Sequence, residues 1–124
     1  MVTSRRELGD FGERVAAHRL ESLGMRIVER NLRIGRIEVD LIAEDGDELV
    51  FVEVRTRRGA AGLAAESVNA PKLRRMWECA VGYCEQNAVP MERLRIDVVA
   101  VDLDASGAAR SVEHFRAVEV PSDD

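Results

Sequence analysis

The stretch GRIEVDLIAEDGDELVFVEVRTRR, from Gly35 to Arg58, predicts the β-hairpin around which the rest of the fold is arranged. Two runs rich in apolar and β-branched residues flank Gly46-Asp47, a pair that is typical of a tight hairpin turn. A two-residue loop with glycine in its first position suits a type II′ turn. This turn fixes which residues of the two strands face each other.

In the register set by this turn, Leu41 lies opposite Val52 and Asp40 lies opposite Glu53. One face of the hairpin is then wholly apolar, and it consists of Val39, Leu41, Ala43, Val50, Val52 and Val54. A shift of one residue would mix charged and apolar side chains on both faces, because side chains alternate with a period of two. The sequence therefore favours the register that brings Asp40 and Glu53 together.

Two carboxylates that face each other across a sheet repel, because directly opposed Cβ atoms are only ~5 Å apart. Glu38 adds a third acid beside Asp40 and Glu53. A divalent cation such as Mg²⁺ would remove the repulsion, since it binds one or two carboxylates together with water and phosphate oxygens. The alternative is a solvated strand face on which the acids pair with Arg55 and Arg36. The pattern alone leaves both interpretations open.

The chain has 124 residues, 46% of them hydrophobic and 33% charged, which is typical of a soluble globular protein. We expect a single domain over residues 1–120 and a disordered tail over residues 121–124. No apolar run approaches the ~20 residues of a membrane span, and the first residues lack the apolar core of a signal peptide. Cys79 and Cys84 match no metal-binding spacing. These features predict a cytoplasmic protein with reduced, buried thiols and no membrane partner.

The net charge of −5 is unevenly distributed. Residues 1–75 carry 14 basic and 13 acidic residues, whereas residues 76–124 carry 4 basic and 10 acidic residues. Basic patches in the first part can therefore still contact phosphate. Of the 18 basic residues, 17 are arginine, and Lys72 is the only lysine.

Two helices are predicted. Residues 4–23 have one apolar face and start with a Ser-x-x-Glu capping box, and Gly24 suits a left-handed C-terminal cap. The second helix starts at the N-cap Asn69 and ends near Gln86. Its apolar stripe consists of Leu73, Met76, Trp77, Ala80, Val81 and Cys84.

The remaining segments complete the order α-β-β-β-α-β-β. Residues 25–31 predict a strand, residues 31–35 a short connection into the hairpin, and residues 57–67 a mobile surface loop. Residues 94–103 predict a buried strand and residues 112–120 a last strand at a sheet edge. A helical crossover between the third and fourth strands suits a parallel return, so we expect an α/β fold with a mixed central sheet flanked by helices.

Four segments carry a resemblance to a known family, namely GDFGERVAAHRLESLGMRIVERN (9–31), IEVDLIAEDGDELVFVEVRTRR (37–58), SVNAPKLRRM (67–76) and LRIDVVAVD (94–102). The chain resembles the PD-(D/E)xK, or restriction-endonuclease-like, nucleases. It most closely resembles the YraN-like bacterial proteins, which are grouped with archaeal Holliday-junction resolvases. The resemblance implies a restriction-endonuclease-like core, Mg²⁺ or Mn²⁺ as cofactor, and endonuclease activity on DNA that includes branched DNA. It also implies a homodimer, because the resolvases act as dimers.

The resemblance also implies roles for individual residues. The catalytic residues are Asp40, Glu53 and Arg55. The metal ligands are Asp40, Glu53, Glu38, Glu13 and the main-chain carbonyl of Val54. A cation at position 55 would orient the attacking water or stabilise the developing negative charge.

Arg55 departs from the family pattern, which has lysine at this position. Either the substitution reduces or abolishes activity and leaves a nucleic-acid-binding module, or another group substitutes. Lys72 is a candidate for that role, although we favour an exposed or phosphate-contacting side chain.

Other side chains have weaker assignments. Arg57, Arg58, Lys72 and Arg36 are the candidates for binding nucleic acid. Asp97, an acid within an apolar strand, is expected to cap a helix or pair with an arginine, and His18 and His114 are expected to be structural. An interaction protein without a nucleic-acid partner is the third possible class, since the last part of the chain is acidic.

Overall fold

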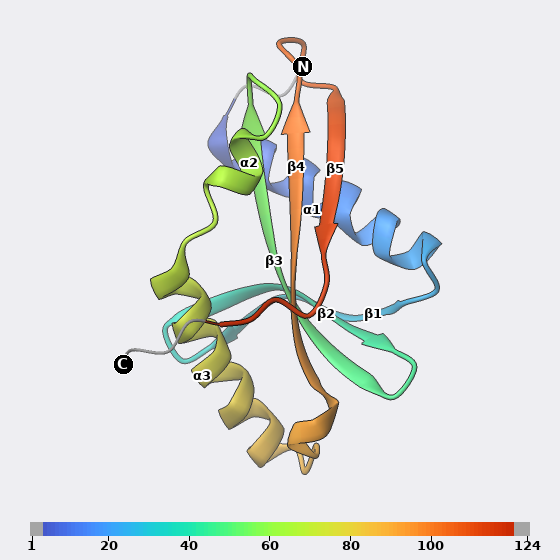
Figure 1. Ribbon diagram of the computed structural model, residues 1–124, viewed down its shortest axis with the longest axis vertical. Helices are drawn as coiled ribbons and strands as arrows, with labels where there is room; N and C mark the ends of the chain where they lie inside the picture. The colour runs from blue at the N-terminus through green and yellow to red at the C-terminus, as the bar shows by residue number, and fades with distance from the viewer. Residues whose placement is uncertain (1–3, 121–124) are drawn as a thin grey trace.

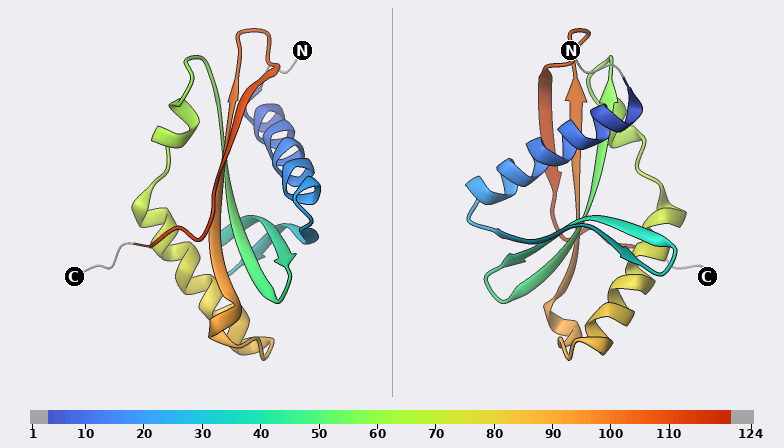
Figure 2. Two further views of the ribbon diagram at one scale, coloured as in Figure 1. Left: turned by 45° about the vertical axis from the view of Figure 1, so that its right-hand side comes forward. Right: turned by 180° about the vertical axis from the view of Figure 1, so that it is seen from behind.

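The computed structural model of the protein describes residues 4–120, so the predicted tail at 121–124 lies outside the described residues. A twisted five-stranded sheet is covered by helix α1 on one face and by helices α2 and α3 on the other (Figures 1 and 2). The elements are α1 (Arg5–Ser22), β1 (Arg26–Ile34), β2 (Ile37–Asp45), β3 (Glu48–Arg58), α2 (Leu63–Glu66), α3 (Ala70–Gln86), a 3₁₀ turn (Met91–Arg93), β4 (Leu94–Leu103) and β5 (Ala109–Phe115).

The strands lie side by side in the order β1-β2-β3-β4-β5. Strands β3 and β4 are parallel, and the other neighbouring pairs are antiparallel. The predicted α-β-β-β-α-β-β order and the mixed sheet are therefore confirmed, with α2 and the 3₁₀ turn as short additions. Among residues 4–120 no helix combines the length and the apolar character that crossing a membrane requires.

The central hairpin forms in the predicted register. Asp45 pairs with Glu48, and the ladder continues to the pair of Leu41 and Val52. Gly46 has a φ of 62°, which is the conformation that a type II′ turn requires at its first loop position. Turn chemistry and the apolar pattern together were sufficient to fix this part of the sheet.

Beyond Leu41 the hairpin departs from the prediction. The β2–β3 ladder ends there, so Asp40 and Glu53 are not a ladder pair. Instead, a carboxylate oxygen of Asp40 accepts a hydrogen bond from the main-chain N–H of Val54, with 2.8 Å between Oδ2 and N. A side chain thus takes the place of a main-chain partner where the two strands separate.

The same irregularity affects strand β1. Arg30 pairs with Leu41 and Leu32 pairs with Val39, but Asn31, between them, is unpaired and has a positive φ of 51°. Val39 consequently packs in the core beneath α3, and the prediction that it shares a face with Leu41 is wrong. The predicted connection over residues 31–35 is also wrong, since β1 continues to Ile34.

Two apolar clusters, one on each face, hold the helices on the sheet. The α1 side contains Ala16, Leu20, Leu41, Val52 and Val101, among others, and the α3 side contains Ile42, Phe51, Met76, Ile96 and Val98, among others. The helix caps form as predicted, with Ser4 Oγ accepting from Glu7 N and Asn69 Oδ1 accepting from Lys72 N. Gly24 has a φ of 92°, as expected for a left-handed cap.

Three further sequence predictions are corrected. Residues 57–67 are not a structureless loop, because β3 continues to Arg58 and the segment then forms α2. The last strand spans Ala109–Phe115 and not 112–120, since the chain leaves the sheet near Ala117, which has a φ of 49°. Trp77 was expected in the core but is 36% exposed, because it lies at the margin of the buried stripe of α3.

Candidate metal and nucleic-acid site

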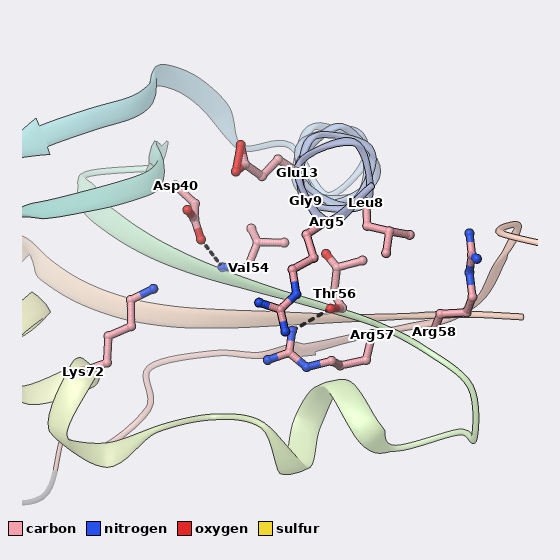
Figure 3. Close-up of a pocket in the computed structure, with 10 residues that line it drawn as sticks. All are labelled: Arg5, Leu8, Gly9, Glu13, Asp40, Val54, Thr56, Arg57, Arg58 and Lys72. Carbon is pink, nitrogen blue, oxygen red and sulfur yellow. Dashed lines mark hydrogen bonds between the residues drawn. The ribbon is translucent and has the colours of Figure 1, made fainter. Parts of the chain in front are cut away.

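A cleft of about 480 Å³ opens where strands β2 and β3 separate, between the start of α1 and the start of α3. Figure 3 shows its lining residues. Its charged lining combines two acids with four basic residues, namely Glu13, Asp40, Arg5, Arg57, Arg58 and Lys72. Acids and several basic residues in one cleft are the combination expected where a metal ion and a phosphate would bind together.

Asp40 is the acid at the point of separation. Burial, followed by the charge of Glu53, raises the pKa of Asp40 to about 7, although the hydrogen bond from Val54 N–H favours its ionised form. The N–H and C=O groups of one residue in a strand point to the same side. Because Val54 N–H points to Asp40, the carbonyl of Val54 is directed to the same gap between the strands.

Glu53 lies deeper, with 3% of its surface exposed. Two cations contact the same oxygen, Oε2, with Lys72 Nζ at 2.9 Å and Arg55 Nη1 at 3.4 Å. The other oxygen, Oε1, is buried and has no hydrogen-bond partner among the residues that the structure describes. A buried carboxylate oxygen without a hydrogen-bond partner destabilises the fold. The charge of Glu53 also raises the pKa of the nearby Asp40.

Lys72 lies in the first turn of α3, and its ammonium group reaches the sheet to contact Glu53. We favoured either an exposed side chain or a phosphate contact for Lys72. The first is wrong, since only 33% of the side chain is exposed and it is paired with Glu53, and the second stays a prediction. Lys72, the only lysine of the chain, thus contacts Glu53. Glu53 lies two residues before position 55, where the family pattern has lysine.

Arg55 does not line the cleft. Its Nε donates to Ser67 Oγ at 3.1 Å, and its Nη1 contacts Glu53. Ser67 Oγ in turn donates to Ala64 O in α2. Arg55 is therefore held between two partners and orients Glu53.

The structure brings some of the remaining predicted residues to the cleft but not others. Glu13 lines it, and burial raises the pKa of Glu13 while a hydrogen bond from Asn31 lowers it. Arg57 and Arg58 are exposed on its rim. Glu38 and Arg36 are both exposed and do not line the cleft.

Sequence reasoning missed several residues of this region, notably Arg5, Ser67 and Asp102. Asp102 is 1% exposed and accepts hydrogen bonds from Gly62 N, Ala64 N and Ser111 Oγ, so it fixes α2 on the sheet. A second acid in the apolar run LRIDVVAVDL was the available signal, but only Asp97 was considered. No comparable signal marked Arg5, which reaches the cleft only through the tertiary fold.

The prediction that Asp97 pairs with an arginine is confirmed. Its two oxygens accept from Arg95 Nε and Nη2, both at 2.9 Å, and Oδ2 also contacts His114 Nε2 at 2.7 Å. His114 therefore belongs to a buried polar network away from the cleft, in agreement with its predicted structural role.

The oxygen donors around Asp40 determine whether a divalent cation fits. Among residues 4–120 no three or more His, Cys, Asp and Glu side chains converge on a ready-made metal site. Mg²⁺, however, needs only one or two carboxylates, and water or phosphate completes its shell. Asp40, the bare Oε1 of Glu53 and the carbonyl of Val54 are oxygen donors of the required kind.

Fold and site together define an α/β protein with a mixed sheet and a cleft lined by two acids and four basic residues, with Glu53 buried beside it. The chain belongs to the uncharacterised protein family UPF0102, whose model matches residues 12–101. The resemblance to the YraN-like proteins is thereby confirmed.

Relatives of this family are similar over nearly the whole chain. A UPF0102 protein of Arthrobacter sp. (strain FB24) is 47% identical over 112 residues, which cover 90% of this chain and 94% of that protein. A UPF0102 protein of Pelotomaculum thermopropionicum is 43% identical over 118 residues, which cover 93% and 97%. Among solved structures, SfsA of Pyrococcus furiosus in complex with Ca²⁺ is similar with a TM-score of 0.36 and 14% identity; the match spans 90% of this chain and 61% of that one.

Proposed function

We propose that this protein is a metal-dependent endonuclease that hydrolyses phosphodiester bonds of DNA, branched DNA included. The observation that carries the proposal is the acid pair (Asp40 and Glu53). Glu53 presents a buried, unpartnered oxygen, and the pKa of Asp40 is raised to about 7 by burial and by Glu53. A divalent cation would satisfy both carboxylates at once.

Mg²⁺ or Mn²⁺ would be held by the acid pair and the carbonyl of Val54, with Glu13 lining the same cleft and close enough for its charge to raise the pKa of Asp40. Such an ion lowers the pKa of a bound water and neutralises negative charge on a scissile phosphate. Glu38 was a further candidate ligand from sequence, but its exposed position gives it no part in this proposal.

The cations around the acid pair have separate roles in the proposal. Arg55 holds the carboxylate of Glu53 in place, because its guanidinium is fixed by Ser67. Lys72 lines the cleft and supplies the mobile ammonium group that would orient the attacking water or stabilise developing charge. Its long stem can turn its ammonium group from Glu53 to a substrate oxygen.

DNA is the proposed partner because Arg57 and Arg58 line the rim of the same cleft. Phosphate contacts by such side chains give affinity without sequence preference. By resemblance to the resolvases we extend the proposal to a homodimer. Light scattering of the purified protein measures that state directly.

The test is incubation of the purified protein with branched and linear DNA in Mg²⁺ or Mn²⁺. We expect cleavage that chelation abolishes, and Asp40→Ala and Glu53→Gln variants that are inactive. The matched control is Asp47→Asn, because Asp47 is an exposed acid of the hairpin turn outside the cleft. If the parent shows no cleavage beyond that of Asp40→Ala under any of these conditions, the catalytic proposal is wrong.

A catalytically inactive nucleic-acid-binding module is the second candidate function. The observation that favours it is that arginine replaces the family lysine at position 55 and is engaged by Ser67 and Glu53. The Arg55→Lys variant separates the two functions. A gain of cleavage indicates an impaired nuclease, whereas salt-sensitive DNA binding without cleavage in both forms supports the module.

A further inference from the structure

Two arginines, one at the start of α1 and one near the end of β3, lie on one wall of the cleft. Arg5 is the first residue of α1, and Arg57 is the penultimate residue of β3. Both line the cleft, and Figure 3 shows their guanidinium groups next to each other. One of them is fixed, since Arg57 Nη1 donates to the carbonyl of Thr56 at 2.7 Å.

This pair of cations has no contacting counterion within the part of the chain that the structure describes, and the more distant charge of Glu53 is the smallest of the effects on the pKa of Arg57. No ion pair joins a carboxylate of residues 4–120 to either arginine. Burial, and then the charges of Arg55 and Arg5, lower the pKa of Arg57. Folding thus holds two like charges together, which an anion with several oxygens would relieve.

Guanidinium groups suit phosphate in particular, because their planar N–H groups donate two parallel hydrogen bonds to its oxygens. An ordinary solvated arginine is also available for comparison in the same helix. Arg6 is exposed and does not line the cleft. The contrast between Arg5 and Arg6 distinguishes a directed side chain from the general charge of the surface.

We propose that Arg5 and Arg57 bind a second phosphate of a polynucleotide, adjacent to the phosphate that lies at the acid pair. The inference rests on the proposed function and specifies its substrate class. Asp40 and Lys72 line the same cleft as the two arginines. A nucleic-acid strand with one phosphate at Asp40 and Lys72 can therefore place the neighbouring phosphate at Arg5 and Arg57. The substrate must then carry at least two linked phosphates, as a polynucleotide does and a single phosphate ester does not.

The test compares binding of a short fluorescent DNA strand to the parent, to the Arg5→Ala/Arg57→Ala variant and to Arg6→Ala, with Ca²⁺ in place of Mg²⁺ and over a range of salt. We expect the double variant to bind about tenfold more weakly or worse. Its slope of log affinity against log salt should fall by roughly 1.5, because each lost contact to a single strand removes ~0.7. The Arg6→Ala variant should change both quantities less than half as much.

Two further measurements keep the outcome decisive. The Arg5→Lys/Arg57→Lys variant keeps the charge and should recover only part of the affinity, because lysine lacks the paired donors. Inorganic phosphate should compete with DNA for the parent but not for the double alanine variant. If the double alanine variant and Arg6→Ala weaken binding equally at unchanged melting temperature, the inference is overturned.

The proposed function and this inference fail in different ways. If the double alanine variant binds DNA as the parent does and metal-dependent cleavage still requires Asp40, the nuclease stands and the second phosphate site does not. If no variant cleaves but DNA binding requires both arginines, the phosphate site stands without the nuclease.

Discussion

Replacing Asp40 by asparagine should make the metal-free protein more stable, although it removes a group that the proposed chemistry needs. The carboxylate of Asp40 is half-buried, and burial, followed by the charge of Glu53, raises its pKa from 3.8 to about 7. The amide oxygen of asparagine can still accept the hydrogen bond that Asp40 accepts from Val54 N–H. The substitution therefore removes the repulsion and keeps the contact.

The pH dependence of this effect has a definite sign. Between the two pKa values the folded protein binds the proton of Asp40 and the unfolded chain does not, so stability is greatest at low pH and falls as pH rises to about 7. A shift of about 3 pH units at ~1.4 kcal/mol each gives an upper limit of ~4 kcal/mol. Because the carboxylate is only half-buried and its surroundings can relax, we expect about 1–3 kcal/mol.

The assay is denaturant unfolding of the parent and of Asp40→Asn in EDTA, at about pH 5 and about pH 8. The variant should be more stable at the higher pH by this amount, and the difference should shrink at the lower pH. The matched Asp47→Asn variant, in the exposed hairpin turn, should leave stability unchanged within ~0.5 kcal/mol. If Asp40→Asn is less stable than the parent at about pH 8, or if the difference does not depend on pH, the reasoning is refuted.

Adding Mn²⁺ should reverse the order. A ligand that binds only the folded state stabilises it by ~4.1 kcal/mol at a thousand times its dissociation constant, which exceeds the advantage expected for Asp40→Asn. The parent should gain this stability, and Asp40→Asn should gain little, because one of its two carboxylate ligands is gone. The same substitution thus distinguishes a stabilising role of Asp40 from a metal-binding role.

Three further predictions concern the framework of the site. Lys72→Gln should reduce cleavage by ~10²-fold or more, because a positioned cation is lost, whereas Arg75→Gln, on the exposed side of α3, should retain activity; single-turnover cleavage measures both. Gly12→Ala should destabilise the fold by ~2 kcal/mol, because a Cβ there would lie 1.8 Å from Thr56 Oγ1, whereas Gly82→Ala in α3 meets nothing within 4 Å and should stabilise it by ~0.5–1 kcal/mol in thermal unfolding. Asp102→Ala should lower the free energy of unfolding by ~2–3 kcal/mol and speed amide hydrogen exchange over residues 60–67, because it leaves the N–H groups of Gly62 and Ala64 unpaired. Unchanged exchange there would contradict the role given to Asp102.

The sequence predicted local features well wherever a single element determined them. The Gly46 turn, the hairpin register up to Leu41 and Val52, and the caps at Ser4 and Asn69 all depend on neighbours within a few residues. The fold order followed from the same local patterns, because a helical crossover between two strands leaves few arrangements open. Local sequence patterns and general topology rules were therefore sufficient to predict most of the helices and strands and their order.

Features that depend on contacts between distant elements were not predicted. The β2–β3 ladder ends at Leu41, opposite the residue before Asn31, whose φ is positive, and neither Asp40 nor Asn31 signals this in advance. The contact of Lys72 with Glu53 depends on how α3 packs, and helix position alone favoured an exposed side chain. The short helix α2 exists because Asp102, far along the chain, supplies the acceptors for its first N–H groups.

Comparison of the buried acids shows why the acid pair points to function. Asp97 and Asp102 are as buried as Glu53, yet both oxygens of each accept hydrogen bonds. Burial alone would raise their pKa, but Arg95 in one case and main-chain N–H groups in the other lower it. The fold can therefore satisfy an interior carboxylate where structure is the only requirement. At Asp40 and Glu53 it leaves one oxygen bare and one pKa raised, and a cation that binds there supplies the missing partner.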